Sequence, residues 1–163
     1  MTDKENNAAL AQFFDGEYHT KRVGPNSSEQ CLFSTNHYVL PDLVKYQKYA
    51  GDWILKNSKR RFELIGTRLS RESPSISKEA IRELLSKEIY HGLCGHYYDD
   101  YFGTLFSIIF DLSDLKANVC FGAPTRNRWQ GPFSLDDPVG VNHYSAILPS
   151  KSIKLDEMWE KQN

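Results

Sequence analysis

The chain lacks long apolar runs, a dominant charge and a secretion signal, and each absence excludes a class of protein. No apolar stretch reaches the roughly 20 residues that a membrane-spanning helix needs, so we expect no membrane partner. A formal net charge of −1 gives no broad positive field, so no nucleic-acid partner is expected either. Residues 1–7 are polar and contain no apolar core of a signal peptide.

Cysteine is also scarce, and its distribution favours reduced thiols. The three cysteines, Cys31, Cys94 and Cys120, are an odd number and lack the paired spacing of a zinc site. Reduced thiols are typical of the cytoplasm, where we therefore expect this protein to be located.

One short cluster could hold a metal or form a catalytic pair. His91, Cys94 and His96 lie within six residues. Zinc sites usually take further ligands from a second cluster, and the remaining histidines are scattered, so we predict no metal and no other cofactor. Cys94 could instead form a nucleophilic pair with His96 or His37, although no third residue that would orient the base is marked.

The composition suits one folded domain. The 163 residues are 40% hydrophobic and 13% aromatic, which favours a packed core over a disordered segment. We expect a single domain over residues 1–163, with a core at 10–150 and tails at 1–9 and 151–163.

Alternating and β-branched segments predict a mostly antiparallel sheet. Residues 17–23 and 31–35 are expected to pair as a hairpin across a longer loop. Residues 104–111 and 117–121 are expected to form a second hairpin, because β-branched and aromatic residues suit a buried strand. Beyond it we expect a surface loop at 123–142 and a last short strand at 143–148.

Apolar residues at helical spacing predict helices within 42–70 and at 77–89. In the first segment, Ser58 could cap a second helical piece. Residues 150–163 are expected to form a polar, partly helical tail. Strands and helices that follow one another in this order define an α+β fold.

Three short blocks carry a resemblance to a known family. The first is residues 32–38, where the polar cluster Thr35-Asn36-His37 follows an apolar run. The second is Ser58 followed by Arg61-Phe62, and the third is residues 103–111. In this order and spacing they resemble the C-terminal half of an N-terminal-nucleophile (Ntn) hydrolase. The specific resemblance is to the choloylglycine hydrolase and penicillin acyltransferase-like group, which are linear amide C–N hydrolases.

The resemblance implies an Ntn-hydrolase-like αββα sandwich, or about half of one. In that family the first half supplies the nucleophile, a cysteine at the start of the mature chain, and an Asp that positions it. This sequence begins Met1-Thr2-Asp3 and contains no recognisable first half. We therefore expect a truncated gene product, one subunit of a split enzyme or a processed chain, and Met1 favours the first two.

The family's chemistry implies cleavage or transfer at a linear amide bond through an acyl-cysteine intermediate. The substrate would be an N-acyl amino compound, a penicillin-like amide or a bile-salt conjugate. Without the terminal cysteine we expect the chain to be inactive alone, and to associate with itself as a homo-oligomer or with a separate N-terminal half. The alternative is a non-catalytic binding or interaction protein that retains half of the fold, with a small N-acyl amide as a ligand.

The resemblance implies a role for Asn36. The family's Thr-Asn pair supplies an amide N–H donor beside the nucleophile, and a side-chain amide at the end of an apolar segment suits that role. The alternative is that Asn36 merely turns the chain before Pro41, because asparagine is common in turns.

Arg61 is the second candidate catalytic residue. The family places an arginine after a serine and directly before a phenylalanine, and Arg61-Phe62 matches that pattern. A guanidinium beside a cysteine lowers the pKa of the thiol and stabilises the thiolate. Arg60 is a competing assignment, and both arginines could instead lie on a solvated helix face.

Overall fold

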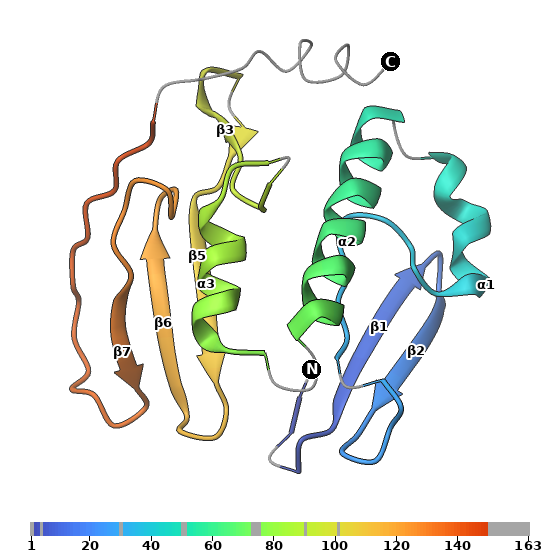
Figure 1. Ribbon diagram of the computed structural model, residues 1–163, viewed down its shortest axis with the longest axis horizontal. Helices are drawn as coiled ribbons and strands as arrows, with labels where there is room; N and C mark the ends of the chain where they lie inside the picture. The colour runs from blue at the N-terminus through green and yellow to red at the C-terminus, as the bar shows by residue number, and fades with distance from the viewer. Residues whose placement is uncertain are drawn as a thin grey trace. The chain divides into compact units, whose positions relative to one another are not determined.

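The chain forms two compact units, residues 1–76 and the residues from Ser77 onward, and each is described by itself. The computed structural model contains helices and antiparallel sheets, which confirms the predicted α+β class. The single domain and the sandwich arrangement stay predictions, and the expected tail at 150–163 lies outside the described residues. Figure 1 shows the elements of both units along the chain. The structure describes residues 2–3, 5–29, 31–49, 52–72, 76–89, 91–100 and 102–149.

The first unit begins with a β-hairpin that the sequence did not predict in this form. Strands β1 (Ala8–Phe14) and β2 (Glu17–Val23) pair antiparallel, with Ala8 opposite Val23 and Phe14 opposite Glu17. Asp15 and Gly16 connect them with φ angles of 47° and 81°, the left-handed pair of a type I′ turn.

The predicted pairing of residues 17–23 with 31–35 is therefore wrong. Residues 31–35 have no regular secondary structure, and β2 pairs with the strand that precedes it. The physical reason is the length of the connection, because closing a two-residue turn costs less chain entropy than closing the longer loop after Val23.

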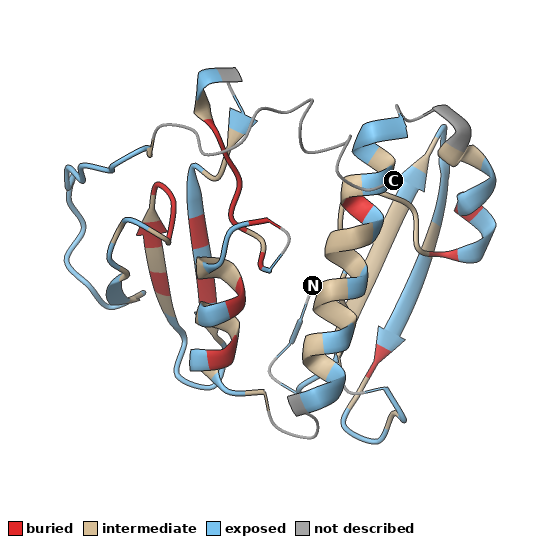
Figure 2. Ribbon diagram, turned by 45° about the horizontal axis from the view of Figure 1, so that its top comes forward, coloured by how far each residue is buried: buried red, intermediate tan, exposed pale blue. Residues whose placement is uncertain are grey.

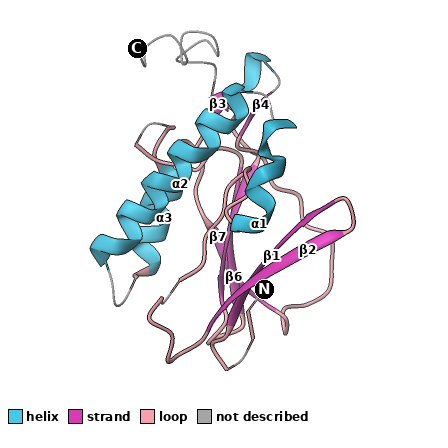
Figure 3. Ribbon diagram, turned by 90° about the vertical axis from the view of Figure 1, so that its right-hand side faces the viewer, coloured by secondary structure: helices cyan, strands magenta, loops and turns pink. Residues whose placement is uncertain are grey.

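Helices follow the hairpin. They are α1 (Pro41–Val44), the short 3₁₀ helix η1 (Lys45–Tyr49) and α2 (Asp52–Glu72). Figure 3 shows the helices of this unit beside the β1–β2 hairpin. The Phe14 and Tyr46 rings stack at 4.1 Å and join β1 to η1.

Ser58 does not cap a second helical piece, as the sequence suggested. It lies inside α2, which continues unbroken through Gly66 to Glu72, and its side chain is fully buried. The helix tolerates Gly66 because the Phe33 ring packs against it. A Cβ added at Gly66 would lie 3.2 Å from that ring.

The second unit begins with α3 (Lys78–Ser86), as predicted, although the helix ends three residues before the predicted boundary at 89. Ser77 caps it, because its Oγ accepts a 3.1 Å hydrogen bond from the Ala80 N–H. Lys87 is extended and stops the helix. Two short strands, β3 (His96–Tyr97) and β4 (Phe102–Gly103), flank the 3₁₀ helix η2 (Tyr98–Asp100).

A three-stranded antiparallel sheet completes this unit. Strands β5 (Phe106–Asp111) and β6 (Lys116–Phe121) confirm the hairpin predicted at 104–121, and β7 (Gln130–Ser134) pairs with β6. Figure 2 shows buried positions on α3, β5 and β6. Among the described residues, no helix is both long and apolar enough to span a bilayer.

Two predictions about the last segments are wrong. The expected loop at 123–142 contains β7, although its Gly131-Pro132 sequence is typical of a loop. The expected strand at 143–148 has no regular structure. Asn127 replaces a strand partner there, because its side chain bonds both the N–H and the carbonyl of Ile147 at 2.7 Å.

Candidate functional site

The two residues selected from the sequence are hydrogen-bonded to each other. Arg61 Nη2 donates to Asn36 Oδ1 at 2.6 Å, and Arg61 Nε donates to Asn57 Oδ1 at 2.8 Å. The orientation of the Asn36 amide follows from chemistry, because arginine has no acceptor and must face the oxygen. The Asn36 Nδ2 donors therefore remain available, without a partner among the described residues.

Arg61 does not lie on a fully solvated helix face. Its side chain is half-buried, and burial lowers the pKa of the guanidinium from its ordinary value. The group still stays charged at any physiological pH. The bond to Asn36 supports Arg61 over Arg60 as the arginine of this site, while its chemical role stays a prediction.

A second set of polar groups lies next to this pair. His37 Nδ1 is 2.8 Å from Ser58 Oγ and 3.0 Å from Thr35 Oγ1. The Thr35 hydroxyl donates to the Ser58 carbonyl at 2.8 Å, and the Ser58 hydroxyl donates to Thr35 Oγ1 at 2.9 Å. The network thus joins the segment around Asn36 to the middle of α2.

The hairpin holds the same segment from its other side. Gln12 on β1 donates from Nε2 to the His37 carbonyl at 3.1 Å. Its Oε1 accepts from the backbone N–H groups of Val39 and Leu40 at 2.9 and 3.0 Å. These bonds substitute for a strand partner and fix the backbone on which Asn36 and His37 lie.

Asn36 and His37 line a pocket of about 370 Å³ in the first unit. None of the lining residues is acidic, and the positive charges of Lys59 and Arg61 act on His37. The pocket therefore favours neutral or anionic ligands over cations. The residues that line it are Gln12, Phe14, Thr35, Asn36, His37, Tyr38, Tyr46 and Gln47.

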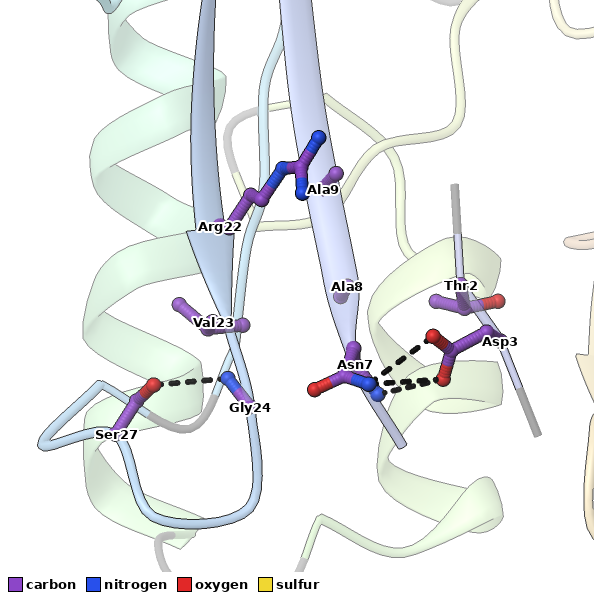
Figure 4. A pocket seen from close by; sticks show the side chains of 9 residues that line it. All are labelled: Thr2, Asp3, Asn7, Ala8, Ala9, Arg22, Val23, Gly24 and Ser27. Atoms are coloured by element: carbon purple, nitrogen blue, oxygen red, sulfur yellow. Dashed lines mark hydrogen bonds between the residues drawn. The ribbon is translucent and has the colours of Figure 1, made fainter. Parts of the chain in front are cut away.

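A larger pocket, of about 510 Å³, lies at the opposite end of the hairpin, where Ala8 pairs with Val23. Figure 4 shows hydrogen bonds between Asp3 and Asn7 and between Ser27 and Gly24 in this pocket, while no bond is drawn to Arg22 or Thr2. Asp3 accepts from the Asn7 side chain and backbone, and Ser27 Oγ accepts from the Gly24 N–H at 2.8 Å. We take the smaller pocket as the candidate because it contains Asn36, and because Asn36 Nδ2 and His37 Nε2 have no partner among the described residues.

In the second unit, Cys94 and His96 approach each other, and the structure supplies the third group that the sequence did not mark. His96 Nε2 is 3.4 Å from Cys94 Sγ and 2.7 Å from Thr125 Oγ1, while Nδ1 is 3.2 Å from Glu88 Oε1. Cys94 is only 1% exposed, and burial raises the pKa of its thiol. A buried thiol with a raised pKa is a poor nucleophile, so we interpret this cluster as structural.

We expect Cys31 alone to react with a small disulfide reagent in the folded chain. Cys31 is half-buried, whereas Cys94 and Cys120 are buried and burial raises the pKa of both thiols. Spectroscopic titration should count one thiol in buffer and three in denaturant. The Cys31→Ser variant should show none in buffer. A thiol that reacts rapidly in that variant would contradict the burial of Cys94 and Cys120.

Metal binding has no support in the described part of the chain. No group of three or more His, Cys, Asp or Glu side chains is placed there to hold an ion. His91 lies on an exposed turn and does not join the cluster around His96.

Comparison with known families identifies the class of protein. The family model for acyl-coenzyme A:6-aminopenicillanic acid acyl-transferase matches residues 1–126 of the 163-residue chain. The chain therefore belongs to this family, which is one of Ntn-hydrolases. The match confirms the resemblance to the acyltransferase group. Comparisons with curated proteins and with solved structures find no match.

Sequence reasoning missed several residues that shape these sites. Ser58 was interpreted as a helix cap, and Gln12 was not selected at all, although both fix the segment around Asn36. Glu88 and Thr125 were also missed in the cluster around His96. No motif contains Gln12, Glu88 or Thr125, and the block that contains Ser58 does not reveal its contact with His37.

Proposed function

We propose that this chain supplies the carbonyl-binding part of an enzyme that cleaves or forms linear amide bonds. The observation behind the proposal is the 2.6 Å hydrogen bond from Arg61 Nη2 to Asn36 Oδ1. It occupies the acceptor of the Asn36 amide and leaves the Nδ2 hydrogens as fixed donors. Such donors stabilise the negative charge that develops on an acyl oxygen when a nucleophile attacks it.

The substrate class follows from the family and from the pocket. The family implies an N-acyl amino compound, a penicillin-like amide or a bile-salt conjugate. Aromatic side chains of Phe14, Tyr38 and Tyr46 line the pocket, and an acyl chain can pack against them. The cationic surroundings of Asn36 also suit the carboxylate that such compounds commonly carry.

We further propose that residues 1–163 alone do not turn over such substrates. A cysteine nucleophile needs both access and an adjacent base. Cys94 has a base in His96 but is buried. Cys31 lies in another pocket, of about 360 Å³, and no histidine is among the described residues that line it. The Lys21 and Glu29 side chains in that pocket form an ion pair with each other at 2.5 Å.

The missing nucleophile would come from a partner, either a separate N-terminal half or a second copy of the chain. Apolar side chains support association. On β5, Phe106, Ile108 and Phe110 are exposed and alternate with the buried Ser107 and Ile109. Exposed apolar surface of this kind is typical of a surface that binds another protein.

The test combines an assay with a binding measurement. We expect the purified chain to release no amine from an N-acyl amino acid, yet to bind it, and to scatter light as more than a monomer at micromolar concentration. Asn36→Ala should weaken binding about tenfold, the loss expected for one hydrogen bond to a charged or polarised group. The exposed Asn26→Ala is the matched control and should bind normally.

Two outcomes would overturn the proposal. Turnover that disappears in Cys31→Ala or Cys94→Ala would show that the chain carries its own nucleophile. Equal binding by the Asn36→Ala and Asn26→Ala variants would remove Asn36 from the site.

The second candidate function is a non-catalytic binding protein that retains half of the family fold. The burial of Cys94 favours it, and so does the ion pair between Lys21 and Glu29 beside Cys31, because binding through Asn36 and Arg61 needs no thiol. We also propose a cytoplasmic location, which is supported by three free cysteines without a disulfide.

A further inference from the structure

We propose that His37 selects secondary amides, because its Nε2 accepts a hydrogen bond from the N–H of an amide bound beside Asn36. The inference rests on the proposed function of the pocket and names the group that discriminates among its ligands. It makes His37 a specificity-determining residue for amides over esters.

The protons of the two neighbouring hydroxyl groups fix the state of the imidazole. In the contact between the Thr35 hydroxyl and the Ser58 carbonyl, the hydroxyl is the donor, because a carbonyl oxygen has no proton. Thr35 Oγ1 then accepts, and the 2.9 Å contact from Ser58 Oγ supplies the donor. Both hydroxyl protons are thereby used within the network.

We therefore assign the proton of the neutral His37 ring to Nδ1, because this tautomer supplies a proton to more of the contacts in the network. Nδ1 lies 2.8 Å from Ser58 Oγ, whose own proton already points to Thr35, so the ring donates to that oxygen. The other tautomer would place the Nδ1 lone pair against Thr35 Oγ1 at 3.0 Å and leave the Ser58–Thr35 contact without a proton. In the neutral ring, a protonated Nδ1 makes Nε2 an acceptor.

The surroundings keep the ring neutral. Burial, and then the positive charges of Lys59 and Arg61, lowers the pKa of His37 from its ordinary value of 6.5. These two cations come from α2, and no carboxylate lines the pocket to oppose them. Tyr38 and Tyr46 also line the pocket.

Asn36 and His37 thus offer groups of opposite character to the same pocket. The Asn36 Nδ2 groups donate and His37 Nε2 accepts, and neither atom has a partner among the described residues. A secondary amide has the complementary pair, a carbonyl acceptor and an N–H donor. An ester has the carbonyl but no N–H. Its oxygen lone pair would face the Nε2 lone pair, so the ester loses this hydrogen bond.

The test compares two ligands of nearly the same size and charge. Phenylacetylglycine carries the N–H, and its ester isostere, phenylacetylglycolic acid, has oxygen in that position. At pH 7.5 we expect the intact chain to bind the amide at least tenfold more tightly than the ester by calorimetry. His37→Phe should reduce the preference for the amide to about twofold or less, whereas Asn36→Ala should weaken the binding of both ligands.

The pH dependence has a definite sign. The preference for the amide should persist at neutral and alkaline pH and should be lost as the pH falls through the lowered pKa of His37. Protonation converts Nε2 from an acceptor into a donor, which suits the ester oxygen better than the amide N–H. A preference for the amide that rises as the pH is lowered from 8 would overturn the inference.

Failure of this inference is distinguishable from failure of the proposed function. Equal binding of both ligands would overturn the role of His37 and leave the carbonyl site intact, whereas binding of neither ligand would overturn both. A second measurement needs no variant, because ¹⁵N NMR of the imidazole reports the tautomer directly. A protonated Nδ1 supports the inference, and a protonated Nε2 in the free chain would contradict it.

Discussion

Replacing Gly92 with alanine should destabilise the second unit by about 3 kcal/mol, the upper part of the range for overpacking a tight site. The chain turns sharply at Gly92 after α3, and its N–H donates to the Glu88 carbonyl at 2.8 Å. A Cβ there would lie 2.4 Å from the Lys87 carbonyl oxygen and 2.7 Å from that of Leu84. Backbone atoms cannot rotate away as a flexible side chain can, so the turn itself must shift.

Urea denaturation followed by circular dichroism measures this effect. For a unit of this size a loss of 1 kcal/mol lowers the melting temperature by about 4–8 °C, so thermal melting offers a second measurement. Gly140→Ala is the matched control, because nothing lies within 4 Å of a Cβ added there. If the Gly92→Ala variant had the same urea midpoint as the Gly140→Ala control, the turn at Gly92 would have room for a Cβ.

The Ser58→Ala substitution should cost the first unit about 2 kcal/mol, although alanine is the better helix former. Ser58 is fully buried in α2, its Oγ lies 2.8 Å from His37 Nδ1, and its hydroxyl donates to Thr35. Removing it takes a partner from the half-buried Thr35 and His37 side chains, and that penalty exceeds the gain in helix propensity.

Ser70→Ala on the same helix is the matched control. Ser70 is exposed, so this change should be neutral or slightly stabilising. Free energies of unfolding from denaturant titration compare the two variants. Equal stabilities would mean that the Thr35–His37–Ser58 network contributes nothing, and the tautomer assigned to His37 would lose its basis.

Local signals in the sequence predicted the parts of the fold that depend on local chemistry. Ser77 caps α3 because its hydroxyl reaches an N–H three residues ahead, and that spacing is readable from the sequence. The β5–β6 hairpin has strands of β-branched and aromatic residues joined by a short connection. The same logic applied to Asp15-Gly16 would have identified the β1–β2 hairpin.

Features that depend on distant contacts could not be predicted. Strand β7 pairs with β6 despite Pro132, because an edge strand tolerates a residue without an N–H. Asn127 replaces a strand partner for the segment around Ile147 through two side-chain bonds, which no periodicity reveals. In the same way, Gln12 acts on the site across 25 residues of sequence.

The chemical roles of the candidate site residues stay predictions, and the network that holds them was not predicted from the sequence. Asn36 and Arg61 were selected through the family resemblance, and the structure places them in a direct hydrogen bond. Physical reasoning on the sequence alone left both with ordinary alternatives, a turn and a solvated helix face. Asn36 lies at an exposed bend, as the turn alternative expects, while the half-buried Arg61 that bonds to it does not lie on a fully solvated helix face.

The central claim is that Arg61 holds the Asn36 amide so that its N–H groups bind an acyl carbonyl. The most direct test follows the two side-chain N–H resonances of Asn36 by ¹H–¹⁵N NMR while phenylacetylglycine is added to the intact chain. We predict that both resonances shift and saturate with the binding curve, and that Arg61→Met, in a chain that remains folded, abolishes the shift. Asn36 resonances that stay unchanged at saturating ligand would contradict the claim.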